Sequence, residues 1–308
     1  MLVKSEKNME FYKTMLSIAL PVTIQNLISS SLNMIDIFMI TKLGEANIAA
    51  VGQANQVFFL FAIILFGINS GSSIFIAQFW GKRDRTNIRR VLGLAIISGV
   101  ILSLIFTFAA ILFPASIMKL LINDTEVIDL GVKYLRVIAI SYIFTAVTFA
   151  YSGACRSIRQ AKLPMLVSIA SILINSVLNY GLIFGNFGLP EMKIEGAALA
   201  TLIARVVECL LIVIMIYKGK GRDVLNAKIS ELTDISFRFV KKFFKTTMPV
   251  IMNEGMWSLG VVMYSIAYAS IGKEATAAVQ VALTIQNIFM VFSLGLASAC
   301  ATMIGNKI

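Results

Sequence analysis

Eight long apolar runs follow one another along this chain, and they limit its fold more than any motif does. A helix needs roughly 20 apolar residues to cross the ~30 Å hydrocarbon core of a bilayer, and each run reaches that length. The runs lie near 14–41, 47–79, 89–113, 128–154, 164–186, 195–217, 243–270 and 275–305. Apolar residues make up 58% of the 308 residues and charged residues only 14%. No soluble domain could keep that much apolar surface out of water. We therefore predict an all-α, polytopic transmembrane helical bundle that passes many times through a cell membrane.

An internal repeat organises these runs. The stretch 21–80 recurs later in the chain without a gap, at the offset that leads from Pro21 to Pro249. The same offset places Gly44 on Gly272, Ala49-Ala50-Val51 on Ala277-Ala278-Val279, Gly67 on Gly295 and Ser70 on Ser298. The second copy begins six runs after the first, an even number, so both enter the membrane from the same side. Parallel repeats of this kind form two lobes with a substrate path at their interface.

The second copy stops after its first hairpin, so we expect a chain that is truncated at its C-terminus. The predicted parts are a six-helix N-terminal transmembrane lobe (1–217), a cytoplasmic amphipathic linker (218–242) and the first helical hairpin of a C-terminal lobe (243–308). The linker has apolar residues at helical spacing with charges between them, which predicts a helix lying on the membrane surface. These apolar residues are Leu225, Ile229, Leu232, Ile235 and Phe239.

The loops between the runs alternate in charge. Arginine and lysine gather after the second, fourth and sixth runs, whereas the other loops carry acidic residues beside their lysines. The positive-inside rule then places the basic loops and the N-terminus in the cytoplasm. The net charge of +11 follows from this orientation and from anionic headgroups nearby. We therefore expect the lipid bilayer, and no nucleic acid, as the partner of the basic residues.

The chain contains no histidine, which removes the usual general base and the usual zinc ligand. Its three cysteines, Cys155, Cys209 and Cys300, are scattered in apolar surroundings and predict packing roles and no disulfide framework. We predict that the protein is not an enzyme and has no catalytic residues and no metal site.

Short segments along nearly the whole chain resemble the multidrug and toxic compound extrusion (MATE) transporters, and their order and spacing are more specific than any one of them. They are Leu20-Pro21, Met34-Ile35-Asp36, Leu43-Gly44 with Ile48 to Val51, Gln78 to Lys82, Tyr134-Leu135-Arg136, Arg156 to Pro164 and Gly196-Ala197-Ala198. The resemblance implies a two-lobe antiporter of twelve spans, of which four are missing here. It implies export of a cationic or amphipathic small molecule in exchange for H⁺ or Na⁺, no other cofactor, and a monomer when full length.

The resemblance also implies a cation-binding site within the N-terminal lobe, formed by Asp36, Asn175, Asn179 and Thr201. Some members carry a second aspartate where this chain has Asn179, so the site here has one carboxylate. Carboxylate, amide and hydroxyl oxygens suit a hard cation, and a lone carboxylate also suits a proton. Two alternatives stay open: Asp36 lies in the outer half of its span, where Lys42 or water could neutralise it, and the two asparagines could instead link helices.

The second copy of the repeat adds two residues by resemblance. Glu254 resembles an acidic residue used for coupling or substrate binding, and Gln280 resembles a glutamine that lines the cavity. The alternative for Glu254 is an ion pair with a lysine of the linker. Pro21 and Pro249 are predicted hinges because proline removes a helical hydrogen bond, although prolines also occur near the start of straight spans.

The predicted function is therefore a cation-coupled antiporter for multidrug efflux that works by alternating access. A lipid-linked saccharide flippase of the same superfamily is one alternative, and it would usually have a cavity crowded with basic residues. Here only Arg205 lies well inside a span, and Glu208 three residues later can neutralise it. A membrane sensor or scaffold without transport activity is the other alternative.

Overall fold

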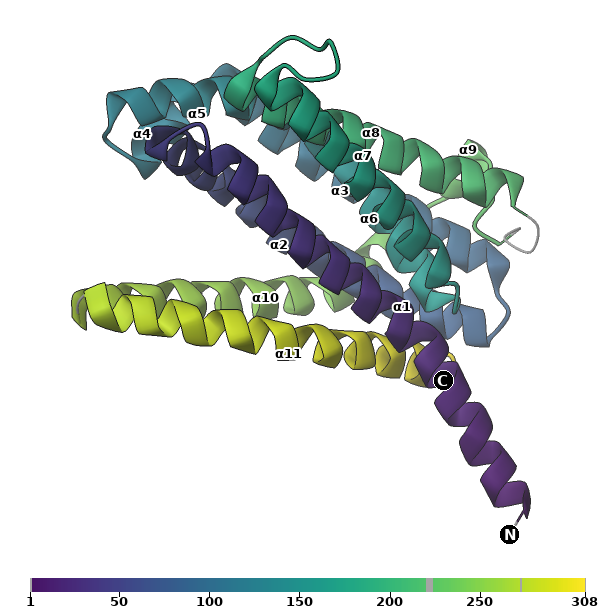
Figure 1. The fold of residues 1–308 in the computed structure, drawn as a ribbon. Helices are drawn as coiled ribbons and strands as arrows, with labels where there is room; N and C mark the ends of the chain where they lie inside the picture. Colours follow the sequence, from purple (N-terminus) through teal and green to yellow (C-terminus); the bar gives the residue numbers. More distant parts are fainter. Residues whose placement is uncertain (1, 220–223, 272, 308) are drawn as a thin grey trace.

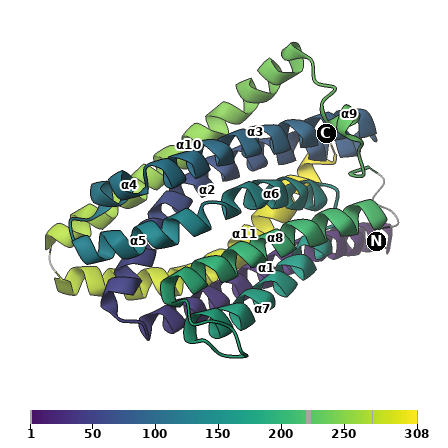
Figure 2. The same ribbon diagram turned by 90° about the horizontal axis from the view of Figure 1, so that it is seen from above.

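The computed structural model describes residues 2–219, 224–271 and 273–307. Within these ranges it leaves out the side chains at 2–10, 29, 31–35, 37, 259, 261–262, 265–285 and 287–288. All regular structure in the described residues is helical (Figures 1 and 2). The helices are α1 (Leu2–Thr41), α2 (Glu45–Gly81), α3 (Arg85–Leu112), α4 (Pro114–Leu121), α5 (Thr125–Ile138), α6 (Ser141–Ser157), α7 (Lys162–Phe184), α8 (Lys193–Lys218), α9 (Ile229–Leu232), α10 (Phe237–Ile271) and α11 (Lys273–Gly305).

The eight predicted runs coincide with the long helices. Seven runs correspond to one helix each, and the fourth corresponds to α5 and α6 together, which meet at an angle of 49°. Within the described residues, α2, α3, α7 and α8 are long and apolar enough to cross a membrane, and the bent pair makes a fifth span. Helices α1, α10 and α11 have 40, 35 and 33 residues, well above the roughly 20 that a span needs. The predicted all-α transmembrane fold is confirmed.

Side-chain caps and one hydrogen bond fix the ends and the bend of these helices. The carboxylates of Asp84 and Asp124 each accept a hydrogen bond at 3.1 Å from the backbone N–H three residues later, which starts α3 and α5. Helix α7 ends at Gly185, whose φ of 70° is free of strain for glycine. At the bend, the Thr107 hydroxyl donates to the Ala139 carbonyl at 2.8 Å and so ties α3 to the break between α5 and α6.

The core of the six-helix lobe is aromatic in one half. Phe61 of α2 stacks on Tyr142 of α6, with ring centroids 5.0 Å apart, and Phe58 and Phe106 pack around this pair. Phe61 and Tyr142 are fully buried. Burial of such large rings accounts for much of the packing between α2, α3 and α6.

The hairpin of α10 and α11 lies against the first hairpin, with α10 on α2 and α11 on α1. Two glycines allow the close approach: a methyl group on Gly67 would come within 2.6 Å of Ile251 Cγ1, and one on Gly295 would collide with the Thr23 hydroxyl. Figure 1 shows the two hairpins in contact near the C-terminal end of α11 and diverging toward the turn between α10 and α11. The pair of lobes is therefore closed at one end of the bundle.

The linker differs from the predicted amphipathic helix. Within its described residues only the four-residue α9 is helical before α10 begins. Leu225 is fully buried in non-helical chain, and Arg89 of α3 forms an ion pair with Glu231. Arg90 pairs with Asp234 at 2.6 Å. Ile229 is 79% exposed, whereas Leu232, Ile235 and Phe239 are half-buried against the lobe. Contacts with the lobe and ion pairs to α3, rather than one continuous helix, join the segment to the protein.

Candidate cation site in the N-terminal lobe

A cluster of four polar side chains lies between α1, α7 and α8. Asn179 Nδ2 donates to Asp36 Oδ1 at 2.8 Å and to Asn175 Oδ1 at 3.2 Å. Asn175 Nδ2 donates to Thr201 Oγ1 at 3.3 Å, and that hydroxyl donates to the Ala197 carbonyl at 3.0 Å. The structure thus brings together all four residues that the sequence assigned to a cation site, while their role stays a prediction.

Helical geometry explains this meeting. Asn175 and Asn179 are four residues apart and therefore share one face of α7, and that helix packs against both α1 and α8. Lys42 does not neutralise Asp36 within the described residues, because its ammonium lies over the rings of Phe38 and Phe184, at 5.3 and 5.8 Å from their centroids. Lys42 is therefore not the counter-ion that the interfacial alternative assigned to Asp36.

The cluster offers oxygen atoms to a ligand. Asn179 is 2% exposed, and its Oδ1 is buried without a hydrogen-bond partner in the described part of the chain. If the Asn175 amide is turned over, its nitrogen donates to Asp36 Oδ2 at 3.0 Å and its oxygen accepts from the Thr201 backbone N–H at 3.3 Å. Nitrogen and oxygen of an amide are assigned from such networks. Both orientations keep the amides around a single carboxylate.

A second polar network borders the first. Arg205 Nη1 donates to Glu208 Oε2 at 2.9 Å, as the sequence predicted, and Glu208 is 4% exposed. Ser168 Oγ donates to Glu208 Oε1 at 2.8 Å, and Gln25 Nε2 donates to Ser168 Oγ at 2.8 Å.

Sequence reasoning missed Gln25 and Ser168 in this network. A signal was present for Ser168, because it lies seven residues before Asn175 and therefore on the same face of α7. Gln25 has the corresponding place on α1, eleven residues before Asp36, which is also close to a whole number of helical turns.

The comparison with protein families decides what this lobe is. The family model described as MatE matches residues 21–181, which is more than half of the chain. The chain belongs to the MATE family. Curated relatives agree: "Probable multidrug resistance protein NorM" of Thermotoga maritima is 25% identical over 303 residues, covering 96% of this chain and 63% of that protein. "Multidrug export protein MepA" of Staphylococcus aureus is 28% identical over 244 residues, covering 78% and 52%. These names describe export proteins and not enzymes, in agreement with the prediction.

Solved MATE structures share the fold. The crystal structure of MATE in complex with MaD3S superposes with a TM-score of 0.85 at 22% identity, covering 96% of this chain and 66% of that one. An outward-facing multidrug resistance MATE transporter gives a TM-score of 0.82 at 22% identity, covering 96% and 65%. This MATE chain spans less than two thirds of the length of the curated relatives named above.

The remaining predicted residues of the MATE chain lie apart from the cluster. Glu254 is half-buried on α10, which packs on α2, and within the described residues no linker lysine pairs with it. The side chain of Gln280 lies outside the described part. Pro21 and Pro249 stand inside the continuous helices α1 and α10, so their role as hinges stays a prediction.

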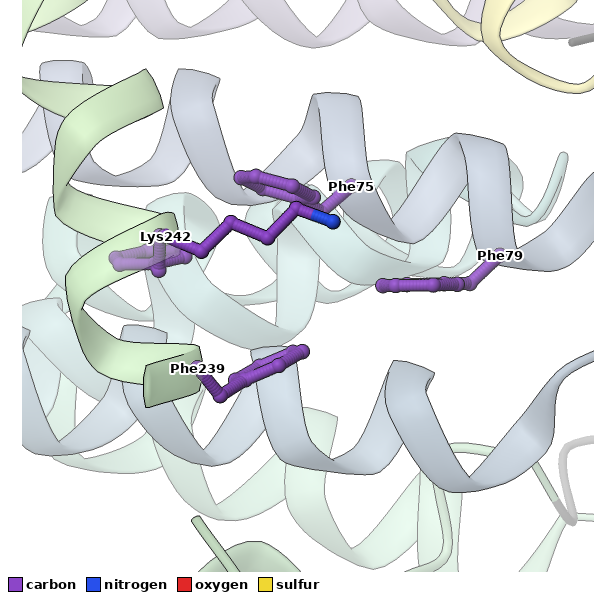
Figure 3. A pocket seen from close by; sticks show the side chains of 5 residues that line it. Phe75, Phe79, Phe239 and Lys242 are labelled. Carbon is purple, nitrogen blue, oxygen red and sulfur yellow. The ribbon is translucent and has the colours of Figure 1, made fainter. Parts of the chain in front are cut away.

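A small aromatic pocket between α2 and α10 of the MATE chain holds no candidate site. Figure 3 shows Phe75 and Phe79 facing Phe239, with Lys242 extending its side chain beside Phe75. The cavity has about 10 Å³, enough for one water molecule at most. The pocket is a packing gap at the junction of the two hairpins.

Proposed function

We propose that this chain provides the N-terminal lobe and first hairpin of a cation-coupled antiporter that exports cationic or amphipathic drugs by alternating access. Membership of the MATE family and the export proteins among its relatives support the transport activity. One observation carries the coupling: a single carboxylate, Asp36, lies among amide and hydroxyl oxygens, and the buried Asn179 Oδ1 beside it has no partner among the described residues.

An ion can drive the change of access only if it interacts differently with the two states. An unpartnered buried oxygen costs about 1–3 kcal/mol, and either occupant of the site would relieve that cost. Na⁺ would take Asn179 Oδ1 as a ligand beside Asp36, whereas a protonated Asp36 would donate a hydrogen bond. We favour H⁺ because a proton needs only the one carboxylate present, while Na⁺ is held better where a second acidic ligand is available.

The substrate path is proposed to lie between the two diverging hairpins. Their contact at one end and divergence at the other support an arrangement that is open to one side of the membrane. With the basic loops in the cytoplasm, as the positive-inside rule predicts, the open side would be the outside. Arg205 lies well inside the span formed by α8, and its pairing with Glu208 supports an exporter rather than a flippase.

The test is gradient-driven export by a two-lobe protein that contains this chain, since the relatives are longer than it. Asp36→Asn removes the charge and keeps the shape, so it should abolish export driven by H⁺ or Na⁺ while insertion stays normal. Asp129→Asn, at an exposed position near the start of α5, is the matched control and should export at the parental rate. Parental export by Asp36→Asn would refute the proposed coupling site.

A further inference from the structure

A large basic cavity lies at the closed end of the bundle, away from the Asp36 cluster. It has a volume of about 610 Å³, within the range of ligand pockets, and Trp80, Arg83, Arg85, Arg159 and Asn306 line it. These residues come from the end of α2, the start of α3, the turn between α6 and α7, and the end of α11. Figures 1 and 2 show the C-terminus at the same end of the bundle as α9.

Among the described residues, the three arginines of the cavity have no counter-ion. No ion pair or hydrogen bond engages the side chains of Arg83, Arg85 or Arg159 in the part of the chain that the structure describes. Asp84, the nearest carboxylate in sequence, is used as the cap of α3, where it accepts from the backbone and side chain of Asn87. Three guanidinium groups around one hollow attract an anion, and guanidinium matches phosphate oxygens in geometry.

Two of these arginines occupy backbone positions that favour glycine. Arg83 has φ 57° and Arg159 has φ 65°. Each follows the end of a span in the same turn: Arg83 N–H donates to the Trp80 carbonyl at 3.1 Å, and Arg159 N–H donates to the Arg156 carbonyl at 3.0 Å. Glycine adopts this helix-ending conformation without strain. The chain places arginine there twice, and both side chains line the same cavity.

Asn306 gives an independent sign of a missing ligand. Its side-chain nitrogen and oxygen are both buried, and neither has a hydrogen-bond partner among the described residues. Buried amides are nearly always hydrogen-bonded, so this pair of atoms requires an explanation. A phosphate oxygen can accept from the amide nitrogen, and a headgroup hydroxyl or ammonium can donate to the amide oxygen.

We propose that this cavity binds the phosphate group of an anionic membrane lipid. It lies at the end of the bundle where the basic loops gather, and such pockets face the anionic headgroups of the cytoplasmic leaflet. Trp80 suits this position because its ring is amphipathic and sits well at the level of the headgroups. A lipid bound here would link α11 to the turns of the six-helix lobe. Gly81 and the Asn306 backbone are already in contact at that point.

Trp80 makes the proposal measurable. The chain has two tryptophans, and Trp257→Phe leaves Trp80 as the sole fluorophore, inside the cavity. Brominated phosphatidylglycerol is titrated into the purified chain in neutral detergent, and brominated phosphatidylcholine serves as the neutral-lipid arm. We expect saturable quenching by phosphatidylglycerol at concentrations where phosphatidylcholine quenches weakly.

Glycine variants separate binding from folding. Arg83→Gly with Arg159→Gly removes two charges and also relieves the strained backbone, so the variant should fold at least as well as the parent. Its affinity for phosphatidylglycerol should be roughly 30-fold weaker, the factor expected for the loss of two cations near a membrane surface. Lys193→Gly is the matched control: Lys193 has φ 50°, begins α8 at the opposite end of the span, and should bind as the parent does.

Arg85→Gln provides a second variant at ordinary helical backbone, and it should weaken binding too. Unchanged quenching by phosphatidylglycerol in the double glycine variant would overturn the proposal, as would equal quenching by phosphatidylcholine. Inorganic phosphate forms the last arm. If millimolar phosphate displaces phosphatidylglycerol completely, the cavity is a site for free phosphate and the lipid assignment is wrong.

Discussion

Gly67 lies where the two hairpins touch, and a single methyl group there should shift the balance between closed and open lobes. The ideal Cβ position at Gly67 is 2.6 Å from Ile251 Cγ1 and 2.9 Å from Ile251 Cα. Because the second atom belongs to the backbone, a side-chain rotation cannot remove the clash. In Gly67→Ala one hairpin must move away from the other.

The size of the effect follows from the cost of overpacking, about 1–3 kcal/mol for an inserted methyl group that forces backbone shifts. This cost applies only while the hairpins are in contact, so it destabilises the closed arrangement relative to an open one. At ~1.4 kcal/mol per factor of ten, the open fraction should rise roughly 5- to 150-fold. The prediction rests on the proposed alternating access.

Gly52→Ala is the matched control, because it lies on the same helix and has nothing within 4 Å of its Cβ position. Both substitutions gain the same helix propensity, about 1 kcal/mol, so the difference between them isolates the contact. The assay is alkylation of Thr247→Cys, a fully buried position of α10 beside Gly71, after replacement of the three native cysteines. Equal alkylation rates in the two alanine variants would refute the assignment of Gly67 as a closing contact.

Three further predictions concern stability and topology. Glu208→Ala should lower the thermal stability of the chain, because the loss of one partner of a buried ion pair costs about 3–5 kcal/mol, a figure that the part exposure of Arg205 reduces. The double variant Arg205→Leu with Glu208→Leu should recover most of this loss. A double variant that is no more stable than Glu208→Ala would contradict the prediction. Thr107→Val should destabilise by about 0.5–1.5 kcal/mol, because it removes the hydrogen bond that ties α3 to the α5–α6 bend while the Ala139 carbonyl still accepts from the Tyr142 N–H at 3.1 Å; an unchanged unfolding midpoint would count against that role. Reporter fusions or cysteine labelling at Lys82 and Lys228 should place both in the cytoplasm, and labelling of either from outside would overturn the topology.

Hydrophobic patterning predicted the fold well because a bilayer leaves few choices. Each apolar run had to be a helix, so all eight were found, and the four polar residues on three of them met as expected. The linker was harder, because apolar residues at helical spacing can also be buried by irregular chain. There Arg89 and Arg90 form ion pairs with linker carboxylates, and no periodicity shows which distant arginine a carboxylate will meet.

The Schellman-type turns at Arg83 and Arg159 were invisible to sequence reasoning for a related reason. Helix ends are usually recognised by glycine, and here arginine stands in its place. Residues that violate a local conformational preference are expected at functional sites. The arginine side chain at each of these turns is therefore more informative about function than the turn itself. The two positions became informative only when the fold brought both side chains to one cavity.

The internal repeat also predicts which contacts recur once one of them is known. The offset from Pro21 to Pro249 converts the contact of Gly67 with Ile251 into that of Gly295 with Thr23, and both occur. The closed end is therefore symmetric about an axis between the hairpins, although the residues in contact differ. A contact that is duplicated about such an axis is broken on both sides at once when the lobes rotate apart. The closed end should consequently open as one cooperative unit, so that a methyl group at either glycine weakens both contacts.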